Sequence, residues 1–362
     1  MEKGPLPLVV GVTGHRDLVP DDAPRIVERV RALFEELSKN YAHTPLVLMS
    51  SLAEGADRLV ARTALECGVG LYAVLPMNAQ AYEGDFESEA SRAEFRELMR
   101  RSFNATVVGA AADANEDSVQ HSGADRDRRY ALSGAFLVSH SQIMIALWDG
   151  DPDELLGGTS QIVRFALQGV PAQFLSAPSE LLRANETGAV YHIGVGRTGK
   201  PKAERARPDA WIYPKDVQSQ SRRGRVSFER SLQALDQFNR DAGSSKRVAP
   251  SKHPAPLLSM DERSRLQLDP ATAYVWDVFA RADSLAIWCG NRTHVAMQAV
   301  FAIIAAAAIV FALFTNFHAD VSDAISQRRY AVFLALVVLA VIVAVWVKGV
   351  GLQDRFQDYR AL

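Results

Sequence analysis

Short apolar runs alternate with amphipathic stretches over residues 1–196. The first run, 6–13, is of strand length and ends at Gly14, His15 and Arg16. Beyond Pro24, apolar residues recur three and four positions apart, which predicts a helix with one buried face. This order recurs and predicts an α/β fold with a mostly parallel, doubly wound, Rossmann-like sheet. The expected strands are 6–13, 45–49, 71–75, 105–109, 142–148, 172–175 and 190–195.

Two long apolar runs lie near the C-terminus. Residues 295–317 and 330–347 contain no Asp, Glu, Lys or Arg, and each is long enough for a helix to cross a hydrocarbon core of about 30 Å. The short connector 318–329 predicts a transmembrane hairpin whose two outer ends lie on the same side. The alternative is a pair of helices buried in a soluble bundle.

Charge around the hairpin predicts its orientation. The N-terminal apolar stretch is too short for a signal peptide, so the first domain is expected in the cytoplasm. Basic residues flank the outer ends, which favours cytoplasmic N- and C-termini, although Arg328 and Arg329 in the connector weaken the asymmetry. The flanking residues are Arg281, Arg292, Lys348, Arg355 and Arg360.

The pattern divides the chain into three parts: an α/β domain over 1–196, a linker over 197–270, and a membrane domain over 271–362. The linker is rich in basic residues interspersed with Pro, Ser and Gly, and one helix is expected around 228–238. It either contacts anionic lipid head groups or is a solvated connector.

Composition restricts the partners. The chain has 40 basic and 42 acidic side chains, so it is no polycation for coating nucleic acid, and any anion binding must be local. Cys67 and Cys289 are too few for a disulfide framework or a four-cysteine zinc site, and no metal is expected.

Three loops, 11–16, 50–58 and 157–160, are expected to converge on one crevice at the carboxyl ends of parallel strands, where ligands bind in open α/β sheets. Their small residues, hydroxyls and basic side chains suit a nucleotide or phosphosugar, with Arg16 or Arg58 opposing the phosphate charge. The alternative is that the glycines only form turns and that His15 and Arg16 pair locally. The candidate ligand-binding residues are Gly11, Thr13, Gly14, His15, Arg16, Ser50, Ser51, Glu54, Gly55, Ala56, Arg58, Gly157, Gly158, Thr159 and Ser160.

Several common catalytic motifs are absent from the sequence. It has no Walker lysine, no G-x-G-x-x-G, no H-E-x-x-H and no G-x-S-x-G. A P-loop NTPase and a standard dinucleotide dehydrogenase are therefore disfavoured.

Several short motifs occur in order over about 5–196: GVTGHRDL at 11–18, SSLAEGADRL at 50–59, LPM at 75–77, IMIALWDG at 143–150 and GGT at 157–159. Together they resemble the SLOG superfamily, which comprises Rossmann-like nucleotide-binding domains related to LOG phosphoribohydrolases, DprA proteins and the sensor domains of TRPM channels.

The C-terminal part combines Trp288, Asn291 and Arg292 with the hairpin and the segment 352–362. In these features it resembles SLATT domains, two-helix membrane effectors of bacterial conflict systems. In that family the last helix is usually longer, so a truncated gene product is one expectation.

Together the resemblances imply a nucleotide-sensing membrane effector of a bacterial defence system, in which ligand binding drives oligomerisation and the hairpin permeabilises the membrane. They imply a multi-pass protein of the inner membrane, a homo-oligomer, a nucleotide or nucleotide-derived second messenger as ligand, and no obligatory cofactor or nucleic-acid partner.

The resemblance also bears on catalysis. LOG-type hydrolases carry a P-G-G-x-G-T-x-x-E stretch whose Glu assists glycosidic cleavage, whereas 157–164 has no carboxylate. Binding without turnover is therefore expected. The alternatives are a membrane-anchored nucleotide phosphoribohydrolase that uses Glu54 and Asp57 as catalytic residues, or a passively anchored sensor.

Overall fold

The computed structural model describes residues 4–108, 123–152, 155–175, 187–198, 209–214, 222–243, 269–316 and 323–361. Two compact units are present: Leu6–Asp236, and Gln237–Leu362 together with Glu2–Pro5. The boundary falls inside one helix, α8 (Arg222–Ala242), within the segment expected to be a linker. Most of that expected linker lies outside the described residues.

The first unit is built on a seven-stranded sheet with the order β4-β3-β2-β1-β5-β6-β7. All neighbouring strands are parallel except β6 and β7, which confirms the predicted mostly parallel α/β sheet. The strands are β1 (Leu8–Gly14), β2 (Leu46–Ser50), β3 (Gly70–Leu75), β4 (Asn104–Val107), β5 (Ile143–Trp148), β6 (Ala189–Gly194) and β7 (Ala210–Ile212).

Helices cover both faces of this sheet. Alternate residues of β5 face opposite ways, so Ile145 joins the core under α1 and α2, whereas Ala146 joins the core under α5 and α6. The main helices are α1 (Ala23–Asn40), α2 (Ala56–Glu66), α3 (Ala79–Glu83), α4 (Glu89–Arg101), α5 (Ala124–Ser139) and α6 (Thr159–Gln168). The sheet is therefore doubly wound, as the sequence predicts.

Strand order places a crevice beside β1. From β1 the chain builds β2, β3 and β4 on one side, and it then returns to form β5 on the other side. In such sheets the connections leave β1 and β5 in opposite directions, which opens a crevice at their carboxyl ends. Gly14 pairs with Leu147 at this edge.

One predicted strand is wrong. Residues 172–175 form a 3-10 turn, Ala172–Phe174, that starts after Pro171 and buries Phe174 in the core under α5 and α6. The edge of the sheet beyond β6 is taken instead by β7, a three-residue antiparallel strand. So short a strand, within a basic stretch, has no periodicity that the sequence pattern could reveal.

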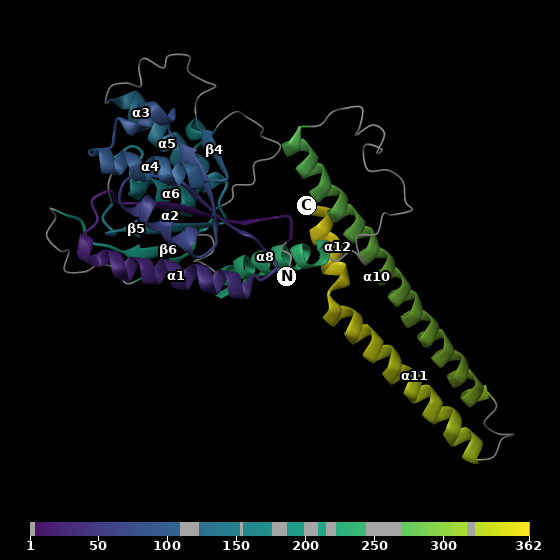
Figure 1. Ribbon diagram of the computed structural model, residues 1–362. Coiled ribbons are helices and arrows are strands. Elements are labelled where there is room, and N and C mark those ends of the chain that lie inside the picture. Colours follow the sequence, from purple (N-terminus) through teal and green to yellow (C-terminus); the bar gives the residue numbers. More distant parts are fainter. Residues whose placement is uncertain are drawn as a thin grey trace. The chain divides into compact units, whose positions relative to one another are not determined.

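The second unit contains α10 (Pro270–Asn316), α11 (Asp323–Val350) and α12 (Leu352–Ala361). The two predicted membrane runs lie on α10 and α11, and of their residues only Phe317 is outside the described part of the chain. The two helices pack side by side (Figure 1). Both helices are long and apolar enough to cross a membrane, and only 6% of each apolar window is buried. A core helix of a soluble bundle would be mostly buried.

In the second unit, a buried polar contact joins the end of α8 to α12. Asp241, in the last turn of α8, is fully buried and accepts a hydrogen bond of 2.7 Å from the Tyr359 hydroxyl of α12. Arg355 lies 3.6 Å from the same carboxylate, and the Phe238 and Tyr359 rings pack edge to face. Burial and this acceptor raise the pKa of Tyr359, so its hydroxyl remains a donor.

A core substitution in α1 tests the fold. Phe34 is 1% exposed, so Phe34→Ala leaves a cavity and is expected to lower the free energy of unfolding by about 3–5 kcal/mol. Lys39→Ala, at an exposed position of the same helix, is the control and should change it by less than about 0.5 kcal/mol. Denaturant unfolding of the full chain in detergent measures both, and equal small effects would contradict the predicted packing of α1.

Candidate functional site

The turn after β1 and the start of α2 meet backbone to backbone. The Ala56 amide donates a hydrogen bond of 3.1 Å to the His15 carbonyl. A Cβ atom on Gly55 would lie 2.2 Å from the Arg16 carbonyl oxygen, and one on Gly14 would lie 2.4 Å from the Ala56 Cβ. Both positions therefore require glycine, and the first two predicted loops are brought together.

Residues Gly11 and Thr13 lie inside β1 and not in the loop after it. Gly11 pairs with Met49 and Met144, and a Cβ there would meet the Met144 sulfur at 2.3 Å. Thr13 is buried. Close packing of the sheet accounts for the glycine at this position.

Asp57 stabilises the second loop through hydrogen bonds. Its carboxyl group accepts hydrogen bonds from the backbone of Ser51 and Ala53 and lies 3.4 Å from the Ser50 hydroxyl. The loop includes Leu52, which is fully buried with a φ of 56°, a conformation that non-glycine residues rarely adopt. Asp57 therefore positions a strained turn, and burial raises its pKa to about 7.

Two other charged residues of this loop face α4 (Glu89–Arg101). The Arg58 guanidinium is buried, donates to the Leu52 carbonyl at 3.0 Å and to the Ser91 hydroxyl at 2.6 Å, and lies 4.2 Å from the centre of the Phe86 ring. The Glu54 carboxylate accepts a hydrogen bond from the Ser91 hydroxyl. These contacts give Arg58 and Glu54 a role in fixing α2 against α4.

His15 joins the ends of β1 and β5. Its Nε2 atom lies 3.2 Å from the Asp149 amide nitrogen and 3.1 Å from the Asp149 carboxylate. Burial lowers the pKa of His15, with Asp149 acting in the opposite direction. Arg197 then bonds Asp17 at 3.0 Å, which ties the segment after β6 to the same turn.

A cavity of about 450 Å³ opens beside this turn. Arg16 supplies one wall from the end of β1, and α5 supplies another through Arg126, Asp127 and Tyr130. Ala81, Gly84 and Asp85, which come from α3 and the residues after it, complete the lining.

The two arginines of the cavity differ in their partners. Arg126 is paired with Asp85 at 2.5 Å. The Arg16 guanidinium is exposed and lies 5.2 Å from the centre of the Tyr130 ring, and among the described residues no carboxylate lies within 4 Å of it. Arg16 is thus a cation available to an anionic ligand.

The buried groups beside the cavity include unsatisfied polar atoms. In the described part of the chain, Arg58 Nη2 and Tyr82 Oη are buried without a hydrogen-bond partner. Arg16, Arg58 and Tyr82 are close enough to interact electrostatically. Buried groups of this kind in native proteins usually bond to water or to a ligand.

The third predicted loop packs against the turn of α5 that contains Asp127 and Tyr130. A Cβ on Gly157 would lie 2.6 Å from the Tyr130 Cβ, and the Gly157 amide donates to the Gln161 side chain at 2.7 Å. Gly158, Thr159 and Ser160 do not line the cavity. The third loop therefore supports Tyr130, while the first loop supplies the charge.

The sequence does not predict the part of the cavity lining that comes from α3 and α5. The acidic and basic run at the start of α5 predicts only a helix packed on the sheet, and the sequence pattern carries no signal that Arg126 and Tyr130 face Arg16. Ser51, expected in the ligand-binding loop, follows β2 and bonds to Ser133 of α5, with 3.0 Å between the hydroxyl oxygens. Within the described residues, no group of three potential metal ligands was found.

Comparison with known proteins gives one weak similarity. No family model and no curated protein match the chain. The X-ray structure of DNA processing protein A (DprA) from Streptococcus pneumoniae is similar at 17% identity and a TM-score of 0.28, over 43% of this chain and 45% of that chain. The chain thus spans less than half of that structure, and so weak a likeness carries no functional argument.

Two glycines with positive φ differ in how well they tolerate a side chain, because Gly55 has both a ψ of −115° and close neighbours. Gly55 and Gly68 have φ values of 77° and 74°, but only at Gly55 would an added Cβ atom have neighbours within 4 Å. Gly68→Ala should lower the free energy of unfolding by about 1–2 kcal/mol, and Gly55→Ala by several kcal/mol more. Equal losses in thermal unfolding of the full chain would show that the contact with Arg16 is absent.

The protonation of Asp57 makes stability depend on pH. The pKa of Asp57 is about 7 in the folded chain and 3.8 in the unfolded chain. Its contribution to the free energy of unfolding is therefore fully present below pH 3.8 and is lost as the pH rises to about 7. Asp57→Asn removes this titration. As the pH rises from 4 to 7, the free energy of unfolding of the variant should therefore increase by up to about 4 kcal/mol relative to that of the parent. Unfolding at several pH values measures the difference, and a difference that is constant with pH would contradict the buried titration.

Proposed function

We propose that the chain is a nucleotide-responsive membrane effector. An anionic nucleotide-derived ligand binds at the carboxyl edge of the sheet, favours association of copies, and brings their apolar hairpins together to permeabilise the membrane. The observation that carries the proposal is the position of Arg16, a cation without a carboxylate partner in the described residues, on the wall of a 450 Å³ cavity beside the β1/β5 switch point.

The cavity suits a nucleotide in size and chemistry. Ligand pockets typically measure 300–1,000 Å³. Arg16 can bond phosphate, the ring of Tyr130 offers an aromatic surface for a base, and Asp127 is an exposed acceptor for ribose or base donors. Arg126 keeps its own charge neutralised by Asp85, so the phosphate would be drawn to Arg16.

The hairpin supports the membrane part of the proposal. Large apolar side chains of α10 and α11 are exposed, among them Phe301, Ile304 and Trp346. A groove of about 540 Å³ between the two helices is lined partly by Ala307, Ala308, Ala340 and Ala344, which allow close approach of a further helix. A single hairpin cannot enclose a conducting path, so permeabilisation requires several copies.

Binding without turnover stays part of the proposal. Glu54 and Asp57, the expected catalytic residues of a hydrolase, do not line the cavity and are engaged by Ser91 and by the backbone of the second loop. No observation favours hydrolysis of a glycosidic bond at this edge.

A dye-release assay tests the proposal. The full chain is reconstituted in liposomes and challenged with a panel of nucleoside mono-, di- and triphosphates and cyclic nucleotides, while binding is measured in detergent. Arg16→Gln should weaken binding at least tenfold and reduce leakage in proportion, because it removes a charge-assisted contact of about 1.5–3 kcal/mol. Arg31→Gln, which breaks a surface pair with Glu66, is the matched control.

Other outcomes favour the alternatives. Binding without leakage would reduce the protein to an anchored sensor, and release of free base that is abolished by Glu54→Gln would make it a hydrolase. Failure of every nucleotide to bind, or equal binding by the two arginine variants, would contradict the proposed site.

A further inference from the structure

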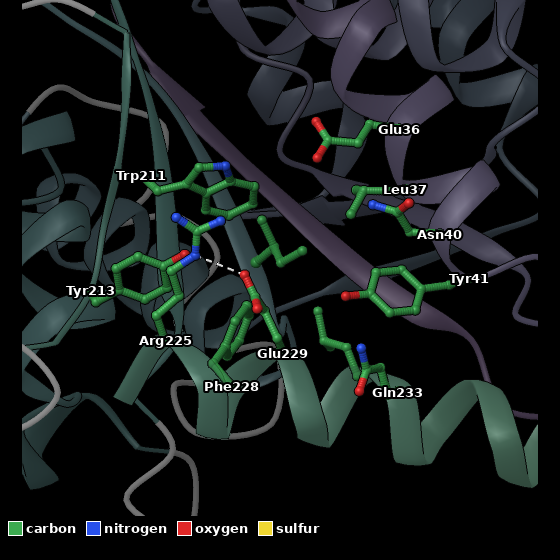
Figure 2. A pocket seen from close by; sticks show the side chains of 12 residues that line it. Glu36, Leu37, Asn40, Tyr41, Trp211, Tyr213, Arg225, Phe228, Glu229 and Gln233 are labelled. Carbon is green, nitrogen blue, oxygen red and sulfur yellow. Dashed lines mark hydrogen bonds and ion pairs between the residues drawn. The ribbon is translucent and has the colours of Figure 1, made fainter. Parts of the chain in front are cut away.

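A second cavity lies at the opposite edge of the sheet. It measures about 380 Å³ and is bounded by the end of α1, the first residue of β5, the strand β7 and the helix α8 (Figure 2). Because α1 runs back across the parallel sheet, its C-terminal residues Asn40 and Tyr41 lie at the amino ends of the strands. This pocket is therefore separate from the cavity beside Arg16.

One face of α8 forms a wall of this pocket. The helix contributes lining residues at spacings of three, four, seven and eight, which share one face of an α-helix: Arg225, Phe228, Glu229, Leu232 and Gln233. The next position on that face, Asp236, accepts hydrogen bonds from the His43 amide at 2.8 Å and the Thr44 hydroxyl at 2.9 Å. These bonds pin α8 beside the end of α1 and fix the wall.

Aromatic rings line much of the pocket. The rings of Trp211 and Tyr213 are 6.4 Å apart and inclined by 20°, and Phe228 lies edge-on to Tyr213 at 6.1 Å. Figure 2 shows Tyr41 facing this group from the α1 side. Burial raises the pKa of Tyr41 and Tyr213, so both hydroxyls are neutral at physiological pH. The arrangement offers stacking surfaces for a planar ring.

The polar groups of the pocket disfavour phosphate. Arg225 is neutralised by Glu229 at 2.7 Å, and Glu36 adds a second carboxylate, so two acidic side chains oppose one basic side chain. The amides of Asn40 and Gln233 bring both donors and acceptors to the lining. Such a set matches a neutral ring whose edge carries donors and acceptors together.

We propose that this pocket binds a phosphate-free planar heteroaromatic compound, of the class of free nucleobases and nucleosides. The aromatic side chains stack on the ligand ring, and the Asn40 and Gln233 amides form hydrogen bonds with its edge. The excess of carboxylates repels a phosphorylated form. The pocket lies on the other edge of the sheet from Arg16, so this proposal does not depend on the proposed function.

Calorimetry on the full chain in detergent tests the proposal with purine and pyrimidine bases, their nucleosides and the corresponding 5′-monophosphates as probes. At least one base or nucleoside is expected to bind, and its monophosphate should bind at least tenfold more weakly at this pocket. Tyr213→Leu and Gln233→Leu should each weaken binding about tenfold. Phe103→Leu, an exposed aromatic residue outside the pocket, is the control and should leave binding unchanged.

Arg16→Gln separates the two proposals. It should weaken nucleotide binding at the first cavity at least tenfold and leave base or nucleoside binding unchanged. Hydrogen exchange should show protection of 36–41 and 225–233 by the ligand. Exchange measured without ligand verifies that each variant is folded. Absence of binding by every base and nucleoside, or binding that neither Tyr213→Leu nor Gln233→Leu weakens, would overturn the assignment.

Discussion

The contact between the turn after β1 and the first residues of α2 is the constraint on which the candidate site depends. The His15 carbonyl can accept the Ala56 amide only because Gly14 and Gly55 have no Cβ atoms in the space between the two segments. This contact occupies a donor at the start of α2. The helix N-terminus is therefore used to hold the turn, and the cation available to a ligand comes from Arg16.

The buried residues Asp57 and Arg58 stabilise the conformation of the turn. Asp57 bonds the backbone of the second loop, and Arg58 passes between the loop and α4, where its charge lies against the Phe86 ring. Removing one partner from such a network leaves an unsatisfied buried group, which is costly. The second loop thus acts as a support for the first, although both carry residue types that suit phosphate binding.

The sequence predicts the sheet, its parallel sense, most helices and the two apolar runs, because each has a clear hydrophobic period. It also predicts that three loops converge on one crevice, since carboxyl ends of parallel strands share an edge. The first two loops meet, whereas the third packs against α5 and does not line the cavity. The sequence does not predict the cavity, because Arg126 and Tyr130 reach Arg16 only through the packing of α5. It also assigns Arg58 to a ligand, because a sequence cannot show that this side chain points into the core.

Photo-crosslinking of the full chain with an azido-nucleotide, followed by peptide mapping, shows whether a nucleotide lies beside Arg16. We expect saturable labelling of the segments around Arg16, Asp85 and Tyr130, suppressed by excess unmodified nucleotide. Labelling that is confined to other segments, or that excess nucleotide does not suppress, would contradict the proposed binding site.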